Sequence, residues 1–454
     1  MNGPIDTTRR SALALLAATA ASPALSAARR RAAMPWLYSL DQLRSEQFLL
    51  VIEQDPAVKA IQAKIRKDLA AGNRFKLPSA ARFLDRALAQ WTRSLIMAEC
   101  IHRTDRPFFV WGTDDTPRQW LGHKLGGVGT SGDNPDAIYR TAGLDGAGRY
   151  EITGSFHPDS RPVQLLFEAN AGDMAQPQNI MPTAGGKHQD IHSASMLNDK
   201  TIQYEPDGSF RITISAEAHA SKNHMQIPNV PYVVVGVRDI LGKWTDKCSK
   251  LSIRRLDPVR PRPWNLATVR ADTLRDLEGY VRFWAHFPDI WFGGLGSNTK
   301  SAPMQRPGGW GFVAGLNFSL KPDEAMLVTT DPAGAKYTGF QINDPWMIAP
   351  DARALQVCLN LGQTTPNADG TISYIISKTD PLVANWLDTE GMDDGIGIMR
   401  WQQIPDGLKG DNLIRDFRVI KLADVAGLKL PMVTAAERRR RVAARWAEYS
   451  SRTR

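Results

Sequence analysis

The sequence has only three cysteines in 454 residues, Cys100, Cys248 and Cys358. An odd number cannot form a complete set of disulfides, and the wide spacing offers no Cys-x-x-Cys pair. Both facts argue against a disulfide-stabilised fold and against a zinc or iron–sulfur site built from thiolates. We therefore expect three buried free thiols.

Two further absences narrow the class of protein. After the first thirty residues, no apolar run is long enough to span a bilayer. The chain also lacks the strand–helix alternation of a nucleotide-binding parallel sheet and the Gly-x-Ser-x-Gly elbow of one large hydrolase class. The sequence therefore predicts no nucleotide cofactor.

Excess charge is confined to the two ends of the chain. The formal net charge is +9, but residues 1–33 carry +4 and residues 437–454 carry +5, so residues 34–436 are neutral overall. A nucleic-acid-binding protein needs a basic face on its folded body, which this composition does not offer, so we expect no nucleic-acid partner. We expect the basic tail to be a solvated helix, with weak contact to an acidic membrane surface as the alternative.

Residues 1–33 have the features of an export signal. Arg9 and Arg10 precede an Ala- and Leu-rich stretch and then small residues suited to cleavage, in TTRRSALALLAATAASPALSAA. This arrangement is typical of a twin-arginine signal, and an ordinary secretory signal is the alternative. The sequence predicts a periplasmic or otherwise exported protein that engages the twin-arginine export machinery.

Residue periodicity divides the rest of the chain into helical and strand-rich parts. Apolar residues at helical spacing are interrupted at Pro56 and Gly72, and a further helix starts near Pro78, where Ser79 is a candidate cap. From residue 107, short alternating or apolar runs separated by turns predict antiparallel strands. The expected class is mainly β, with jelly-roll-like antiparallel sandwich blocks. We expect an N-terminal helical segment (34–106), a first β-sandwich region (107–265), a linking helix and loop (266–300), a second β-rich region (301–433) and a basic C-terminal helix (434–454) opened by a Thr434-x-x-Glu437 capping box.

Five of the eight histidines lie between residues 157 and 224, and His188 and His192 flank Asp190 in GGKHQDIHSAS. On a helix these two imidazoles share one face, which is metal-ligand spacing, but the segment does not have a clear helical pattern and lacks the His-Glu-x-x-His motif. A divalent metal on His188 and His192 is therefore an alternative, and no metal is predicted. Acid–base chemistry by a histidine oriented by a carboxylate is the preferred hypothesis.

Thirteen tryptophans are about twice the usual share for a soluble protein. Many lie beside polar residues in predicted loops, where a large ring with one donor suits the wall of a ligand site. Burial in sandwich cores is the equally weighted alternative. The tryptophans in question are Trp111, Trp120, Trp291, Trp310, Trp346, Trp386 and Trp401.

Two segments resemble a bacterial family of unknown function, domain-of-unknown-function family twelve-fourteen. The first is DNPDAIYRTAGLDGAGRYEITG, and the second runs from FQINDPW through DPLVANWLDTEG to IGIMRW. The resemblance covers residues from about 107 to 420 and implies a jelly-roll-like β-sandwich, but no reaction. The matching positions of the second segment are Asn343, Asp344, Trp346, Asp380, Pro381, Asn385, Trp386, Leu387, Asp388, Thr389, Gly391, Gly395, Arg400 and Trp401.

The segment DPLVANWLDTEG, residues 380–391, is expected to be a loop that pins the end of a sandwich. In the structural interpretation, Asp388 pairs with Arg400 and locks the corner. In the functional interpretation, polar groups and tryptophans form one small-molecule pocket. Its predicted binding residues are Trp346, Trp386, Trp401, Asn385, Arg400 and Tyr139, and its candidate catalytic residues are His188, His192, Asp190 and Asp388.

Three functions remain open from the sequence. The first is an exported enzyme that acts on a small apolar or aromatic molecule by non-redox acid–base chemistry, as an isomerase, lyase or hydrolase. The second is a periplasmic binding protein for small molecules or saccharides, without turnover. The third is an envelope protein anchored by its basic tail. The substrate and the oligomeric state are not determined by the sequence.

Overall fold

The computed structural model describes residues 35–177 and 193–453. The predicted export signal at 1–33 and the predicted catalytic residues His188, Asp190 and His192 lie outside this range. No helix in the described part is both long enough and apolar enough to cross a membrane.

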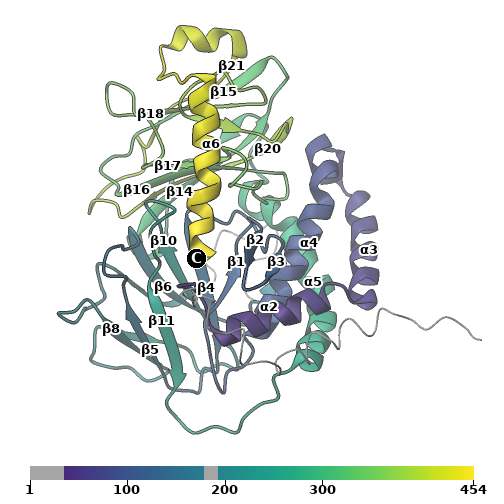
Figure 1. The fold of residues 1–454 in the computed structure, drawn as a ribbon, viewed down its shortest axis with the longest axis vertical. Coiled ribbons are helices and arrows are strands. Elements are labelled where there is room, and N and C mark those ends of the chain that lie inside the picture. Colours follow the sequence, from purple (N-terminus) through teal and green to yellow (C-terminus); the bar gives the residue numbers. More distant parts are fainter. Residues whose placement is uncertain (1–34, 178–192, 454) are drawn as a thin grey trace, which may run out of the picture.

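Four helices pack together on one side of the molecule (Figure 1). They are α2 (Leu40–Ile52), α3 (Pro56–Ala70), α4 (Pro78–Cys100) and α5 (Leu266–Phe292), with the short 3-10 helix η1 (Asn73–Lys76) between α3 and α4. The first two begin where polar side chains accept backbone N–H groups, Ser39 from Gln42 and Asp55 from Ala57. The predicted cap at Ser79 is wrong. The N-cap of α4 is Leu77, and the Ser79 hydroxyl instead accepts from the backbone N–H of Asp393 at 3.1 Å.

The first sandwich consists of two mostly antiparallel sheets that enclose one apolar core. Side chains such as Phe167, Val235 and Ile212 alternate inward from both sheets into that core. One sheet has the order β1 (Val110–Thr113), β4 (Ala137–Leu144), β10 (Val233–Ile240), β6 (Gln164–Ala171) and β7 (Ser193–Asn198). The other has β11 (Lys250–Arg255), β5 (Tyr150–Ser155), β8 (Phe210–Ser215) and β9 (His224–Gln226). A separate hairpin of β2 (Arg118–Trp120) and β3 (His123–Leu125) lies against β1, where the rings of Trp120 and Trp111 meet edge to face.

The second sandwich repeats this two-layer arrangement. Its larger sheet has the order β12 (Thr299–Lys300), β14 (Gly311–Ser319), β20 (Asp394–Gln402), β16 (Tyr337–Asn343) and β17 (Cys358–Asn360), and β13 (Met304–Gln305) also pairs with β14. The smaller sheet has β19 (Trp386–Asp388), β18 (Ile372–Ser377), β15 (Glu324–Thr330) and β21 (Ile414–Lys421). The other 3-10 helices in the described part of the chain are η3 (Pro307–Gly309), η4 (Leu422–Leu428) and η5 (Ser451–Thr453). The predicted mainly β, antiparallel sandwich class is thus confirmed.

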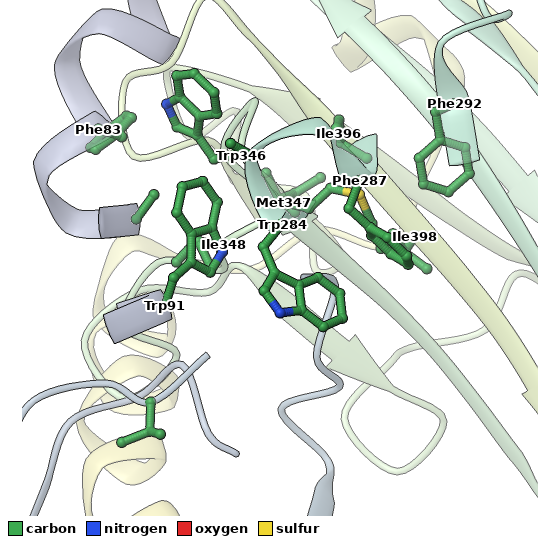
Figure 2. Packing of buried hydrophobic residues seen from close by; sticks show 14 of the residues in the cluster. Phe83, Trp91, Trp284, Phe287, Phe292, Trp346, Met347, Ile348, Ile396 and Ile398 are labelled. Carbon is green, nitrogen blue, oxygen red and sulfur yellow. The ribbon is translucent and has the colours of Figure 1, made fainter. Parts of the chain in front are cut away.

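The helices share a core with the second sandwich. Trp91 of α4 meets Trp346 edge to face with ring centroids 6.0 Å apart, and Figure 2 shows both rings in one cluster with Trp284 and Phe287 of α5. The Trp346 indole N–H donates to the carbonyl of Ala80 at 2.8 Å, which ties this loop to the start of α4. The helices and the second sandwich therefore pack as one unit.

The C-terminal helix α6 (Ala435–Ser450) lies along both sandwiches, as Figure 1 shows. Its capping box of Thr434 and Glu437 is confirmed. The expectation of a solvated basic helix is wrong for one stripe of arginines, Arg438 and Arg445 of α6 and Arg452 of η5, which are only 7 %, 4 % and 5 % exposed. Their spacing of seven residues places them on the buried face, where Arg438 pairs with the carboxylate of Asp380 and the other two donate to backbone carbonyls.

All three cysteines are free and buried, as expected. Burial raises the pKa of Cys100 and Cys248 to about 12 and that of Cys358 to about 11. Since the thiolate is the reactive form, none of them has the character of a nucleophile.

Candidate functional site

A cavity of about 200 Å³ lies at the junction of the two sandwiches and α5. Strands β4 and β10 of the first sandwich contribute one wall, and β14 and β20 of the second contribute another. The C-terminal half of α5 and the loop at residues 130–133 close the remaining sides. The cavity therefore brings together segments that are far apart in the sequence.

One side of the cavity is aromatic. On α5, Trp284, Phe287, Trp291 and Phe292 recur at helical spacing and so face the same way. The rings are in mutual contact, with centroids 4.9 Å apart for Trp284–Phe287 and 5.8 Å apart for Phe287–Trp291. Phe312 of β14 adds to this wall. Such a surface suits a flat or apolar molecular body.

The lining of the cavity is also cationic. Arg238 of β10, Arg306 beside η3 and Arg400 of β20 all line the cavity. Arg400 donates to the side-chain oxygen of Gln341 at 2.5 Å and to the carbonyl of Gly132. One nitrogen of Arg238 lies 2.9 Å from Glu168. Two of the three guanidinium groups are thus held in place by protein acceptors.

Three buried donors at this end have no acceptor in the described part of the chain: Nη1 of Arg238, Nε of Arg306 and Nε1 of Trp310. Arg306 instead lies over two rings, 5.3 Å from the centroid of Trp310 and 5.8 Å from that of Trp291. Burial, together with the positive charges of Arg238 and Arg400, lowers the pKa of Arg306 to about 10, so the group is still protonated at neutral pH. A buried cation with unmet donors favours an anionic partner.

An acid–base pair lies next to the arginines. Asp133 accepts from the backbone N–H of Thr130 at 2.7 Å, and the Tyr139 hydroxyl accepts from the backbone N–H of Asn134 at 3.1 Å. Burial raises the pKa of Asp133 to about 6, while the Thr130 bonds and Arg400 oppose the rise. Burial also raises the pKa of Tyr139. A carboxyl group with a pKa near neutrality can exchange a proton with a bound molecule.

Of the six predicted binding residues, Tyr139 and Arg400 line this cavity. The single aromatic pocket predicted around Trp346, Trp386 and Trp401 is wrong, because these rings are buried in cores. The Trp386 indole N–H donates to the carbonyl of Ser377 in the core of the smaller sheet, and that of Trp401 donates to the carbonyl of Asp331. Neighbours on a strand point to opposite faces, so Arg400 and Trp401 cannot line the same pocket.

The predicted ion pair between Asp388 and Arg400 is also wrong. Asp388 accepts from the backbone N–H of Glu390 at 2.8 Å, within the turn that follows β19. Strands β19 and β20 belong to different sheets, which separates the two side chains. The amide of predicted binding residue Asn385 bonds both the N–H and the carbonyl of Thr365 at 2.8 Å, which is the pinning role of the structural interpretation.

The histidine hypothesis stays untested by this geometry. His188, Asp190 and His192 lie outside the described residues. Among the described histidines none lines the cavity. His157 accepts from the backbone N–H of Asp159 at 3.2 Å, and its ring meets that of Trp36 edge to face. Of the seven tryptophans considered as ligand walls, Trp291 and Trp310 line the cavity.

Sequence reasoning missed Arg238, Arg306 and the role of Asp133. Each lies in a different segment, with no local motif to connect them. One partial signal is the Gly-x-Gly-x-x-Gly spacing of residues 127–132, which overlaps the cavity loop at residues 130–133. No helix follows this segment, so it is not the phosphate-binding turn of a parallel sheet.

Comparison with known families shows that residues 139–236 match the family described as "Protein of unknown function (DUF1214)". The resemblance found in the sequence is thereby confirmed for this part of the chain, which includes Tyr139 and Arg238 of the cavity. The second resembling segment lies outside the matched residues. A comparison with curated proteins gives no match.

Two solved structures are similar to this chain to different degrees. An uncharacterized protein from Burkholderia cenocepacia is similar with a TM-score of 0.62 and 24 % identity, over 84 % of this chain and 100 % of that one. The VPA0106 protein from Vibrio parahaemolyticus has a TM-score of 0.38 and 12 % identity, over 64 % of this chain and 90 % of that one. The first likeness supports the overall architecture.

Proposed function

We propose that the cavity between the sandwiches binds a small organic anion with an aromatic or apolar body. The observation that carries this proposal is the set of unmet buried donors on Arg238, Arg306 and Trp310, in a cavity that the aromatic residues of α5 also line. An acidic group at the arginines would accept these donors, and the rest of the molecule would cover the rings.

The charge of the site favours an anion over a neutral saccharide. Three guanidinium groups lie here with two carboxyl groups, Asp133 in the lining and Glu168, which pairs with Arg238. A cavity of about 200 Å³ is at the small end for ligand sites, so one ring or a short chain is the expected size.

Acid–base turnover of the bound anion is the second candidate function, which keeps the hypothesis of an isomerase, lyase or hydrolase. It is favoured by Asp133 and Tyr139, which line the cavity together with the arginines. In this scheme Asp133 accepts or returns a proton, and Tyr139 donates a hydrogen bond to the oxygen that gains charge. We place this activity in the periplasm, in keeping with the twin-arginine sequence at residues 1–33.

The test is a matched ligand panel measured by isothermal titration calorimetry. Benzoate, phenylacetate, hexanoate and phenyl phosphate are compared with the neutral benzamide, phenylacetamide and hexanamide. We expect acids to bind and amides not to bind, and Arg306→Gln or Arg238→Gln to weaken binding about 10- to 100-fold, as expected for a charge-assisted hydrogen bond.

Arg439→Gln is the matched control, because Arg439 is exposed on α6 and does not line the cavity. Its affinity should equal that of the wild type. Equal binding of acids and amides, binding by none of the acids, or full affinity in both cavity variants would each overturn the proposal.

A further inference from the structure

A second group of ionisable side chains lies where α4, α5 and the loop after β6 meet. Glu99 is near the end of α4, His102 follows that helix, and Asp272 is in the first half of α5. One ligand atom from each, two carboxylate oxygens and one imidazole nitrogen, all lie within 4.8 Å of one another. None of these residues lines the cavity described above, so the cluster is independent of the proposed function.

Glu99 is buried with a carboxylate oxygen left over after its contact with His102. The residue is 1 % exposed, and its Oε2 lies 2.8 Å from Nδ1 of His102. Its Oε1 has no hydrogen-bond donor anywhere in residues 35–177 and 193–453. Burial of a carboxylate oxygen without a donor is costly, so the oxygen is better satisfied by a ligand that brings positive charge.

The imidazole is oriented as metal-binding histidines usually are. Its Nε2 lies 2.8 Å from Oδ1 of Asp173, and the backbone N–H of Ala175 donates to the same oxygen at 2.9 Å. A carboxylate on the far nitrogen fixes the ring and leaves the other nitrogen for the metal. Here that other nitrogen, Nδ1, lies 2.8 Å from Oε2 of Glu99, a contact that a bound metal ion would replace.

We propose that Glu99, His102 and Asp272 bind one divalent transition-metal ion, with Asp173 as the outer-shell group that orients the histidine. One nitrogen and two carboxylate oxygens suit Zn²⁺ or Mn²⁺ better than Ca²⁺, which prefers oxygen ligands alone. Arg275 donates to Asp272 and also bonds Asp276, so it can keep a carboxylate partner when Asp272 turns to the metal. The ion would join two helices to the loop that follows β6.

The test is titration of the full chain with ZnCl₂ and with MnCl₂ after treatment with a chelator. We expect binding of one equivalent by calorimetry. Loss of an outer-shell group usually lowers metal affinity about 10- to 100-fold. We therefore expect Asp173→Asn to weaken metal binding about 10-fold, and Glu99→Gln and Asp272→Asn each to weaken it by at least about 10- to 100-fold. Glu278→Gln is the control, since Glu278 lies on the same helix and pairs with Lys64 at the surface.

A crystal soaked in MnCl₂ gives a second measurement, namely an anomalous-scattering peak between Glu99 and His102. If Glu99→Gln does not fold, Asp272→Asn and the anomalous peak decide the matter. The proposal is overturned if neither metal binds, which would leave His102 as an ion-pair bridge between Glu99 and Asp173. It is also overturned if the folded variants bind metal as tightly as Glu278→Gln does.

Discussion

The guanidinium of Arg306 lies 5.3 Å from the centroid of the Trp310 ring, and both residues carry a buried N–H that no acceptor in the described chain satisfies. Contact with the rings offsets part of the cost of burying this charge, but it does not fill the hydrogen-bonding capacity of Arg306. The pair thus joins the aromatic and the cationic sides of the cavity.

The burial of Arg306 without an acceptor in the described chain predicts that replacing this residue lowers the affinity for the ligand without lowering the stability of the fold. In Arg306→Met, an apolar chain of similar reach replaces a cation that lacks an ion pair within the described residues. We expect the free energy of unfolding to stay unchanged or to rise by about 1 kcal/mol, while the affinity for benzoate-type acids falls at least tenfold. Urea unfolding and calorimetry measure the two quantities. A loss of stability of several kcal/mol would contradict this account.

Asp133 gives a pH-dependent prediction. Burial raises its pKa in the folded protein to about 6, above the value of about 3.9 in an unfolded chain. The folded state therefore binds more protons between about pH 4 and pH 6, and the contribution of this group to stability falls as the pH rises through that window. Asp133→Asn should match the wild type near pH 4 and exceed it by about 1–2 kcal/mol at pH 7.5. A difference that does not vary with pH would refute the assignment.

Gly129 holds the cavity loop close to a buried carboxyl group. A Cβ at this position would lie 1.6 Å from Oδ1 of Asp115 and 2.5 Å from the side-chain oxygen of Gln90. Gly129→Ala should therefore displace the loop at residues 130–133 and lower the free energy of unfolding by about 2–4 kcal/mol. The control is Gly294→Ala, because a Cβ at Gly294 meets nothing within 4 Å. Equal melting temperatures for the two variants would count against this packing.

Substitutions of two adjacent arginines of α6 should have very different effects on the free energy of unfolding. Nε of Arg438 donates to Asp380 at 2.8 Å and its Nη1 to the side-chain oxygen of Gln356 at 2.7 Å, in a buried position. Arg438→Ala leaves both acceptors without this partner and should cost about 2–4 kcal/mol, whereas exposed Arg439→Ala should stay within about 0.5 kcal/mol of the wild type. Chemical denaturation of the pair tests this. Similar stability of both variants would mean that the buried contacts of Arg438 contribute little to holding α6 against the second sandwich.

Much of the fold could be predicted from local chemistry. Caps such as the Thr434–Glu437 box, and the alternating runs that became β10 and β20, depend on neighbours in the sequence. The stripe of Arg438, Arg445 and Arg452 was present in the sequence as a seven-residue spacing, yet a run of arginines indicates solvent more often than burial. Only the acceptors on other elements show that this stripe is buried.

The candidate site was less accessible to prediction, for two physical reasons. Its arginines come from β10, the η3 loop and β20, and no local sequence pattern indicates that these segments lie next to one another in the fold. A tryptophan also looks the same in sequence whether it fills a core, as Trp401 does, or lines a cavity, as Trp291 does. Tyr139 and Arg400 were predicted as binding residues because they belong to the resembling segments.

Helix α6 has a mechanical consequence for the molecule. Near its start Arg438 is fixed to the second sandwich, and near its end the hydroxyl of Tyr449 donates to Asp114 of the first at 2.5 Å. Tyr337 crosses the same junction by donating to Asp136 at 2.7 Å. These contacts at both ends of α6 oppose a hinge motion between the two sandwiches. We therefore expect a bound molecule to enter and leave by rotation of side chains at the cavity. The rate of this exchange should depend on the size of the rings on α5 more than on the viscosity of the solvent.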